Sequence, residues 1–144
     1  MMPKISEEII LNCSKEKAFN EMVTVDFMKK IDSNFGLNTE ILFQNARLLR
    51  SLSKVERVGN VEIERLNFPE NFTIVTQRRP PLAPFVYQLS LQMFYEHKDG
   101  TLLKWINEFE VDENNKPKEE IILSHIKKND IFNLQKTQNY FNNT

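Results

Sequence analysis

Two arginines that fall in step with apolar residues on neighbouring strands constrain the fold of this chain most. The stretch from Val61 to Val111 predicts four consecutive strands, at Val61–Leu66, Phe72–Arg79, Phe85–Glu96 and Thr101–Val111. Side chains alternate between the two faces of a strand, so Arg65 shares a face with Val61 and Arg78 shares one with Ile74. An unpaired charge in a dry core is costly. The pattern therefore indicates either a buried ion pair or a cavity with a polar guest, and we favour the cavity.

The remainder of the chain predicts further strands and three helices around this stretch. Ser14 and Pro117 mark the expected beginnings of two of the helices. The expected elements are a strand at Lys4–Leu11, helices at Lys15–Val23 and Asp26–Ile31, strands at Thr39–Gln44 and Ala46–Arg57, and a long helix at Lys118–Asn142. This order predicts an α+β fold of one domain, residues 1–144, in which a seven-stranded antiparallel sheet curls around the C-terminal helix.

Composition excludes several classes of function. The 19 lysines and arginines nearly balance the 20 aspartates and glutamates, so the chain lacks the charge excess typical of nucleic-acid binding. Three glycines cannot supply a phosphate-binding loop, and two distant histidines with one cysteine make neither a metal site nor an internal disulfide. The N-terminus has no apolar signal region and the chain has no long apolar run, so we expect a cytoplasmic protein that does not bind membranes.

Several segments between Val61 and Asn142 match the residue spacing of a known enzyme family. They are Thr73–Arg78, Pro84–Tyr87, Tyr95, Gly100–Thr101, Lys104–Phe109, Ser124–Ile126 and Asn133–Leu134. These segments resemble the aromatase/cyclases of bacterial type II polyketide synthesis, of the monodomain tetracenomycin and spore-pigment type. Residues Ile5–Val23 resemble only the generic start of a Bet v 1/START-like domain. The resemblance implies the helix-grip fold, which agrees with the predicted order of strands and helices.

The resemblance also implies a function and a set of site residues. Members of the family fold a carrier-tethered poly-β-ketone in an internal cavity and direct its intramolecular aldol cyclisation and dehydration, with neither cofactor nor metal. The expected partners are the polyketide intermediate and an acyl carrier protein, together with a second copy of the chain or a biosynthetic partner protein. Arg65 takes the place of the arginine that polarises or protonates a ketone. The remaining expected pocket residues are Arg78, Asn133, Asn107, Phe35, Gln92, Trp105 and Gln88.

Three of these positions depart from the family pattern. Phe35 stands where the family has a tyrosine, Gln92 replaces a tryptophan, and Asn107 replaces a glutamine. The missing hydroxyl at position 35 favours an alternative function, in which the same hollow domain carries a lipid, quinone or polyketide without chemistry. A third interpretation is a partner-binding subunit with a degenerate pocket, which predicts a cavity too small for a multi-ketide chain.

The residues alone leave several side-chain roles open. For Arg65, an ion pair is the alternative to the cavity, with three candidate partners: Glu62, Glu64 and Glu108. Arg79 could point inward in place of Arg78 if the strand bulges before Pro80. Asn133 could bond a loop backbone instead of a ligand.

The strand at Phe85–Tyr95 allows two opposite orientations. Alternation alone buries its apolar set, which is Phe85, Tyr87, Leu89, Leu91, Met93 and Tyr95. The family pattern instead turns a second set toward the cavity, which is Gln88, Ser90, Gln92 and Phe94. We favour the family orientation. It leaves an apolar face outward, and such a face predicts an interface and hence a dimer.

Overall fold

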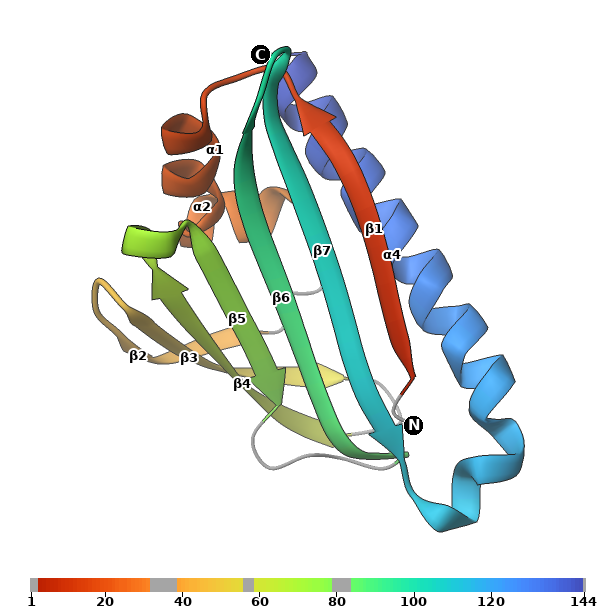
Figure 1. The fold of residues 1–144 in the computed structure, drawn as a ribbon. Helices are drawn as coiled ribbons and strands as arrows, with labels where there is room; N and C mark the ends of the chain where they lie inside the picture. Colours follow the sequence, from red (N-terminus) through yellow and green to blue (C-terminus); the bar gives the residue numbers. More distant parts are fainter. Residues whose placement is uncertain (1–2, 32–38, 56–58, 79–83, 144) are drawn as a thin grey trace.

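One seven-stranded antiparallel sheet dominates the computed structural model, which describes residues 3–31, 39–55, 59–78 and 84–143 (Figure 1). The strands are β1 Lys4–Leu11, β2 Thr39–Gln44, β3 Leu48–Val55, β4 Gly59–Phe68, β5 Thr73–Arg78, β6 Phe85–His97 and β7 Gly100–Val111. Their order across the sheet is β1-β7-β6-β5-β4-β3-β2. The N-terminal strand therefore forms one edge and pairs with β7, the last strand in the chain.

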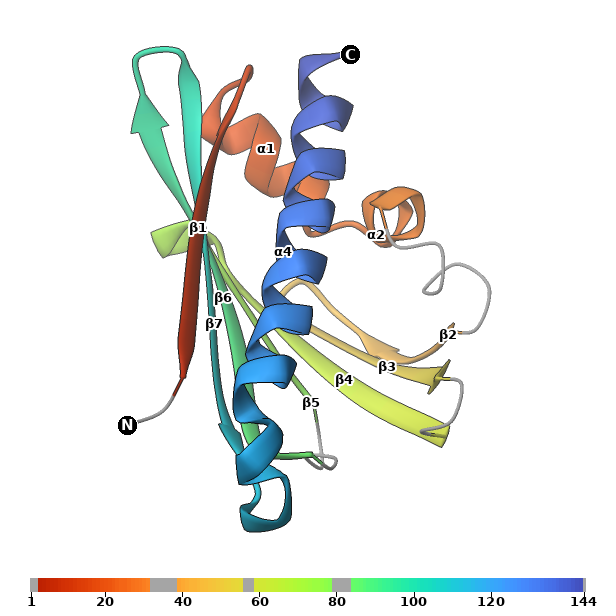
Figure 2. The same cartoon turned by 90° about the vertical axis from the view of Figure 1, so that its right-hand side faces the viewer.

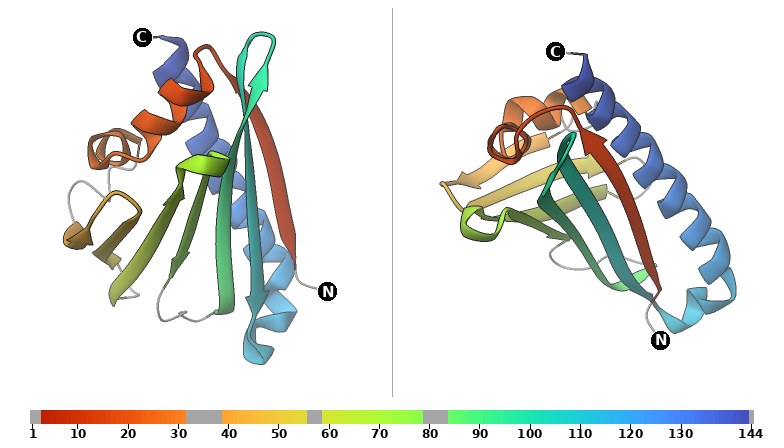
Figure 3. Two further views of the ribbon diagram at one scale, coloured as in Figure 1. Left: turned by 60° about the vertical axis from the view of Figure 1, so that its left-hand side comes forward. Right: turned by 45° about the horizontal axis from the view of Figure 1, so that its top comes forward.

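The described residues form three α-helices, which lie on the concave side of this sheet: α1 Lys15–Met22, α2 Val25–Ile31 and α4 Glu119–Asn142. Figure 2 shows α4 running along the curved sheet, with α1 and α2 beside its C-terminal half. The two further views in Figure 3 show the same grip of the sheet around the long helix. The predicted α+β architecture is confirmed, including the helix and strand order.

A few element boundaries differ from the prediction, each for a local reason. The long helix begins at Glu119, because Pro117 lies in a preceding 3-10 helix, Glu113–Lys118. β5 begins at Thr73, because Phe72 ends a 3-10 turn with a left-handed φ of 46°. The side-chain oxygen of Asn45 accepts hydrogen bonds from two backbone amides in the β2–β3 turn, so β3 begins later than predicted, at Leu48.

β6 adopts the orientation that the family resemblance favoured. Ser90 and Gln92 pair across the ladder with Asn107 and Trp105, whose side chains face the concave side. Phe94 is 3% exposed. Simple alternation predicts that Tyr87, Leu89, Leu91, Met93 and Tyr95 are buried. In the structure these side chains lie on the convex side and are half-buried or exposed, so that prediction was wrong.

An irregularity at the start of β6 explains why simple alternation failed. The register shifts between Phe85 and Tyr87, which changes the phase of the side chains along the strand. Phe85 consequently also packs inward, with its ring centroid 5.6 Å from that of Phe109, while Val86 is 53% exposed. A bulge of this kind leaves no clear mark in the hydrophobic pattern.

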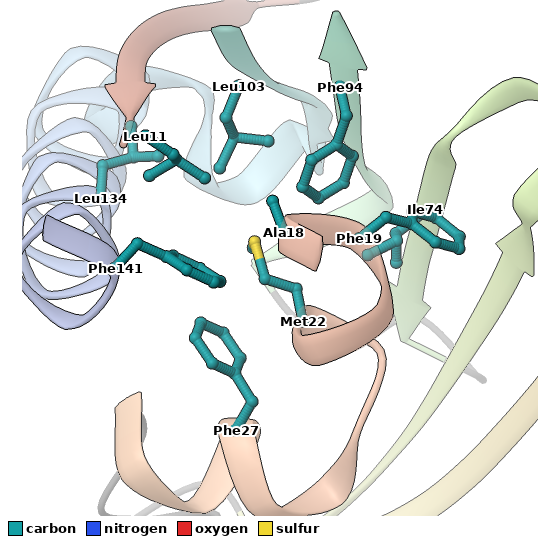
Figure 4. Packing of buried hydrophobic residues seen from close by; sticks show 10 residues of the cluster. All are labelled: Leu11, Ala18, Phe19, Met22, Phe27, Ile74, Phe94, Leu103, Leu134 and Phe141. Carbon is teal, nitrogen blue, oxygen red and sulfur yellow. The ribbon is translucent and has the colours of Figure 1, made fainter. Parts of the chain in front are cut away.

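The core consists of two apolar clusters at opposite ends of the helix–sheet interface. The larger one, shown in Figure 4, joins α1, α2 and the end of α4 to the sheet through Leu11, Ala18, Phe19, Met22, Phe27, Ile74, Phe94, Leu103, Leu134 and Phe141. The smaller one contains Ile5, Phe109 and Val111, with the first turns of α4 packed against it. Along β7 the inner residues between Leu103 and Phe109 are Trp105 and Asn107. Between the two apolar clusters, the helix–sheet interface is therefore lined partly by Trp105 and Asn107.

Candidate functional site

A row of polar side chains crosses the inner face of the sheet between the two clusters. The strand registers place Arg65 of β4 opposite Thr76 of β5, Thr76 opposite Ser90 of β6, and Ser90 opposite Asn107 of β7. Directly opposed residues of an antiparallel ladder share a face. With strands about 4.8 Å apart, this polar row spans about 14 Å from Arg65 to Asn107.

A pocket of about 220 Å³ lies over the first part of this row. Its walls come from α1, α2, α4 and strands β3 to β7, and most of the lining is apolar. The lining residues are Met22, Phe27, Met28, Ile31, Leu49, Ser51, Ile63, Arg65, Thr76, Ser90, Gln92, Trp105, Asn133 and Thr137. The structure thus brings together four of the predicted site residues: Arg65, Gln92, Trp105 and Asn133.

Arg65 is the cationic group of this pocket. Its Nη2 donates to the backbone oxygen of Met22 at 3.0 Å and to Oε1 of Gln92 at 3.3 Å, so α1 and β6 hold the guanidinium in place. Its Nε is buried and has no hydrogen-bond partner within the described chain. Burial lowers the pKa of Arg65 to about 10, which still leaves the group charged at neutral pH.

No ion pair neutralises Arg65 within the part of the chain that the structure describes. Two of the three carboxylates considered from the sequence have other partners. Glu62 pairs with Arg50, and Glu64 accepts a hydrogen bond from the side-chain amide of Gln77 at 2.9 Å. The guanidinium therefore retains an unused donor, Nε, and a charge without a carboxylate partner. Both are available to a polar ligand in the pocket.

Trp105 and Ser90 form a fixed wall of the pocket beside the arginine. The indole Nε1 of Trp105 donates to Oγ of Ser90 at 2.7 Å. This hydrogen bond sets the orientation of the ring and satisfies its only polar atom. On the opposite side, Asn133 and Thr137 of α4 line the pocket one helical turn apart. The hydroxyl of Thr137 donates to the backbone oxygen of Asn133 at 2.9 Å, which leaves the side-chain amide of Asn133 uninvolved in this bond.

A buried carboxyl lies at the far end of the polar row. Asp130 of α4 is 4% exposed, and its Oδ2 accepts a hydrogen bond from Nδ2 of Asn107 at 3.3 Å. Burial raises the pKa of Asp130 to about 6, the Asn107 bond opposes this, and nearby Glu7 adds to it. Oδ1 of Asn107 is buried without a partner among the described residues. This end of the row therefore combines an acid that titrates near neutrality with a free acceptor.

Three predicted site residues that the structure describes, Arg78, Gln88 and Asn107, are not among the residues that line the pocket. Arg78 lies opposite Ile63 and so on the inner face, but its guanidinium rests 5.9 Å from the ring centroid of Phe85; burial lowers the pKa of Arg78. Gln88 lies opposite Phe109, with its Oε1 buried and unbonded within the described chain. Phe35 lies outside the described residues.

Asp130 is the site residue that sequence reasoning missed, although a signal was present. It falls four residues after Ile126 and four before Leu134, so a carboxylate interrupts the apolar stripe of the helix. A charged residue in such a stripe is either paired or functional.

Two further observations concern metal binding and membrane-spanning helices. Among the described residues, no group of three or more His, Cys, Asp or Glu side chains lies close enough to hold a metal ion. None of the described helices is both long and apolar enough to cross a membrane.

Comparison with known proteins gives relatives by fold and none by sequence. No protein-family model and no curated protein sequence matches the chain. The Zhui aromatase/cyclase from Streptomyces sp. R1128 is 12% identical at a TM-score of 0.76, over 99% of this chain and 94% of that one. A START superfamily protein from Mycobacterium smegmatis is 13% identical at 0.69, over 97% of both chains.

A third match is the di-domain aromatase/cyclase StfQ from the steffimycin biosynthetic pathway. It is 9% identical at a TM-score of 0.79 over 99% of this chain, which spans 52% of the di-domain protein. At these identities the likeness is one of fold. The chain therefore has the Bet v 1/START-like helix-grip fold, which it shares with aromatase/cyclases and with START superfamily proteins.

Proposed function

We propose that this protein is a cofactor-independent polyketide cyclase, with residues 1–144 forming one cyclase domain. The observation that carries the proposal is Arg65, a half-buried side chain on the pocket wall whose Nε is buried without a hydrogen-bond partner and whose charge has no carboxylate partner among the described residues. A carbonyl oxygen that gains negative charge during reaction is the guest that such a group stabilises best. The fold that this chain shares with aromatase/cyclases also supports the proposal of a polyketide cyclase.

The proposed reaction is an intramolecular aldol condensation of a poly-β-ketone. A base removes a proton from a methylene carbon between two carbonyls, and the enolate carbon attacks a ketone carbon of the same chain. That ketone oxygen becomes an alkoxide, which Arg65 stabilises until it is protonated. Loss of the hydroxyl together with a neighbouring proton releases one water and leaves a carbon–carbon double bond. The condensation and the loss of water together need neither an oxidant nor a reductant.

Asp130 is the proton acceptor in this proposal; it bonds Asn107 at the end of the polar row and is not itself among the residues that line the pocket. A carboxyl whose pKa is about 6 is largely ionised at neutral pH and is basic enough to accept a proton. Asn107 holds one of its oxygens, and the free Oδ1 of Asn107 can accept from an enol hydroxyl. Asn133 follows Asp130 by one helical turn and lines the pocket. Asn133 binds a further carbonyl of the folded chain.

The pocket volume favours a short substrate. An apolar cavity of about 150 Å³ holds one benzene ring. A pocket of about 220 Å³ therefore accepts a guest of about one to two rings. The apolar walls and the fixed Trp105 ring orient the chain, so that one pairing of methylene and ketone is favoured over the others. The proposed partners are an acyl carrier protein, which presents the substrate as a thioester in the cytoplasm, and a second copy of this chain.

The test compares Arg65→Ala with Arg47→Ala, an exposed arginine that pairs with Glu70. Each variant is supplied with a carrier-tethered poly-β-ketone, and cyclised and shunt products are separated and weighed by mass spectrometry. Loss of one donor to an oxyanion costs about 100-fold in rate. We expect Arg65→Ala to yield shunt products while still folding, and Arg47→Ala to behave as wild type. An unchanged product distribution for Arg65→Ala would refute the cyclase.

The second candidate is a carrier of a hydrophobic ligand. It is favoured by the phenylalanine at position 35 and by the largely apolar lining of the pocket. In that case Arg65→Ala lowers the affinity for a bound quinone, fatty acid or polyketide. Adding the wild-type protein to the carrier-tethered poly-β-ketone then gives the same products as the substrate alone. A protein that neither changes products nor binds such ligands would instead be a partner-binding subunit.

A further inference from the structure

The hydroxyl of Ser90 in the pocket wall has a defined role in hydrogen bonding, because its partner in the described chain is a pure donor. The indole N–H of Trp105 can donate but not accept, so Oγ of Ser90 is the acceptor of the 2.7 Å bond between them. The hydroxyl hydrogen therefore points away from the indole. Within the described chain it makes no second hydrogen bond, not even with Thr76, the opposed residue on β5. Ser90 thus offers an unused O–H donor to the pocket that it lines.

Arg65 brings its guanidinium close to the same part of β6. Its Nη2 donates to Oε1 of Gln92 at 3.3 Å, and Gln92 follows Ser90 by two residues on the inner face. Residues two apart on one strand are about 6.8 Å apart. The Nε of Arg65 is buried and has no partner within the described chain. The pocket wall therefore presents two unused donors, and a ligand with two neighbouring oxygens can bond both.

The order of side chains along the polar row matches the order of events in the proposed reaction. On one side Ser90 is paired with Asn107, whose amide donates to Asp130. On the other side Ser90 is paired with Thr76, and Thr76 is paired with Arg65. The donor of Ser90 therefore lies between the proposed proton acceptor and the group that stabilises the alkoxide.

We propose that Ser90 is a catalytic residue that stabilises the enolate, a role that rests on the proposed cyclase function. When Asp130 takes the methylene proton, the electron pair of the C–H bond moves onto the adjacent carbonyl oxygen. The hydroxyl of Ser90 donates to that oxygen and keeps its own proton. The electron pair then forms the new carbon–carbon bond, and the negative charge passes to the ketone oxygen beside Arg65. Trp105 is a positioning residue, because its N–H occupies Oγ and directs the hydroxyl hydrogen of Ser90 away from the indole.

The same contacts argue against Ser90 as a nucleophile. A nucleophilic serine needs a neighbouring base to take its proton. Neither His97 nor His125 is among the residues that line this pocket. The bond from Trp105 also polarises the hydroxyl, since linked hydrogen bonds strengthen one another. Ser90 is therefore a poorer nucleophile and a better donor than a free serine.

The test measures binding of two probes by isothermal titration calorimetry. Cyclohexane-1,3-dione is largely an enolate at neutral pH and mimics the charged intermediate, whereas cyclohexanone is neutral and has one oxygen. A hydrogen bond to a charged group changes affinity by about tenfold or more. We expect Ser90→Ala to bind the dione about tenfold more weakly than wild type and to bind cyclohexanone equally well. Trp105→Phe, which keeps a ring but removes the N–H, should show a smaller loss that is also confined to the dione.

Ser53→Ala is the matched control. Ser53 is 3% exposed on the inner face of β3, shares a 2.7 Å hydrogen bond with Thr39, and is not among the residues that line the pocket. It therefore loses a buried hydrogen bond of the same length as Ser90→Ala does, and it should bind both probes as wild type does. A Ser90→Ala variant that binds the dione as tightly as wild type, or that loses affinity equally for both probes, would overturn the role of Ser90.

Product analysis separates this role from the proposed function. With a carrier-tethered poly-β-ketone, Ser90→Ala should cyclise about 100-fold more slowly than wild type, because the bond to the enolate oxygen is strongest when that oxygen is charged. A wild type that forms no cyclised product overturns the cyclase, and the catalytic role of Ser90 with it. If wild type and Ser90→Ala cyclise at the same rate, the cyclase stands and only the role of Ser90 is wrong.

Discussion

Replacing the buried acid of α4 by its amide should make the protein more stable while removing its activity. Asp130 is 4% exposed and the pKa of its carboxyl is raised to about 6, against an ordinary 3.8. Each pKa unit corresponds to about 1.4 kcal/mol, so ionised Asp130 costs the folded state about 3 kcal/mol. Asp130→Asn removes this cost, and its amide can donate to the buried Oδ1 of Asn107, which has no partner within the described chain.

The sign of the pH dependence follows from the direction of the shift. Folding favours the protonated acid, because its pKa is higher in the folded chain than in the unfolded one. The contribution of Asp130 to stability is therefore full below pH 3.8 and is lost as the pH rises through about 6. We expect Asp130→Asn to exceed wild type by about 1–3 kcal/mol at pH 7.5 and to match it near pH 4.

Urea denaturation at a series of pH values measures this difference. Asp26→Asn, at an exposed position in α2, is the matched control and should keep the wild-type pH slope. The reasoning fails if Asp130→Asn is less stable than wild type at pH 7.5, or if its stability still falls between pH 4 and pH 7 as wild type does. A gain in stability with loss of activity is typical of a polar group retained for function.

Two further outcomes follow from the same structure. The cyclisation rate of wild type should rise with pH through about 6, as Asp130 ionises, and a rate that is flat between pH 5 and pH 8 would remove Asp130 from the mechanism. Gly100→Ala should destabilise the fold by at least about 2 kcal/mol, because Gly100 has a φ of 134° and an added Cβ would lie 2.2 Å from the backbone oxygen of Leu11. Thermal unfolding measures this loss, and a neutral effect would contradict the tight packing of β1 against the β6–β7 turn.

Most of the fold could be predicted from hydrophobic period and turn residues. The strands at Lys4–Leu11 and Thr39–Gln44 were placed at their observed ends. These elements have an unbroken pattern and clear boundaries. The orientation of β6 could not be derived in this way, because its apolar set lies outward and a bulge changes its phase.

The candidate site could be predicted only in part. Arg65, Gln92, Trp105 and Asn133 line one pocket, since strand registers and a helical repeat bring them together. The pairing of Asp130 with Asn107 depends on how α4 docks on β7, which no local pattern contains. The same is true of the pocket volume, because it is what remains after two distant clusters have packed.

The most direct measurement of the central claim is the side-chain Nε–H resonance of Arg65 during titration with a 1,3-diketone analogue of the substrate. This donor is buried and has no partner within the described chain, so a guest carbonyl in the pocket should bond it and shift the resonance. The Nε–H of Arg50, which donates to Glu62 at 2.9 Å, should not move. Saturable binding that leaves the Arg65 resonance unchanged would contradict the account.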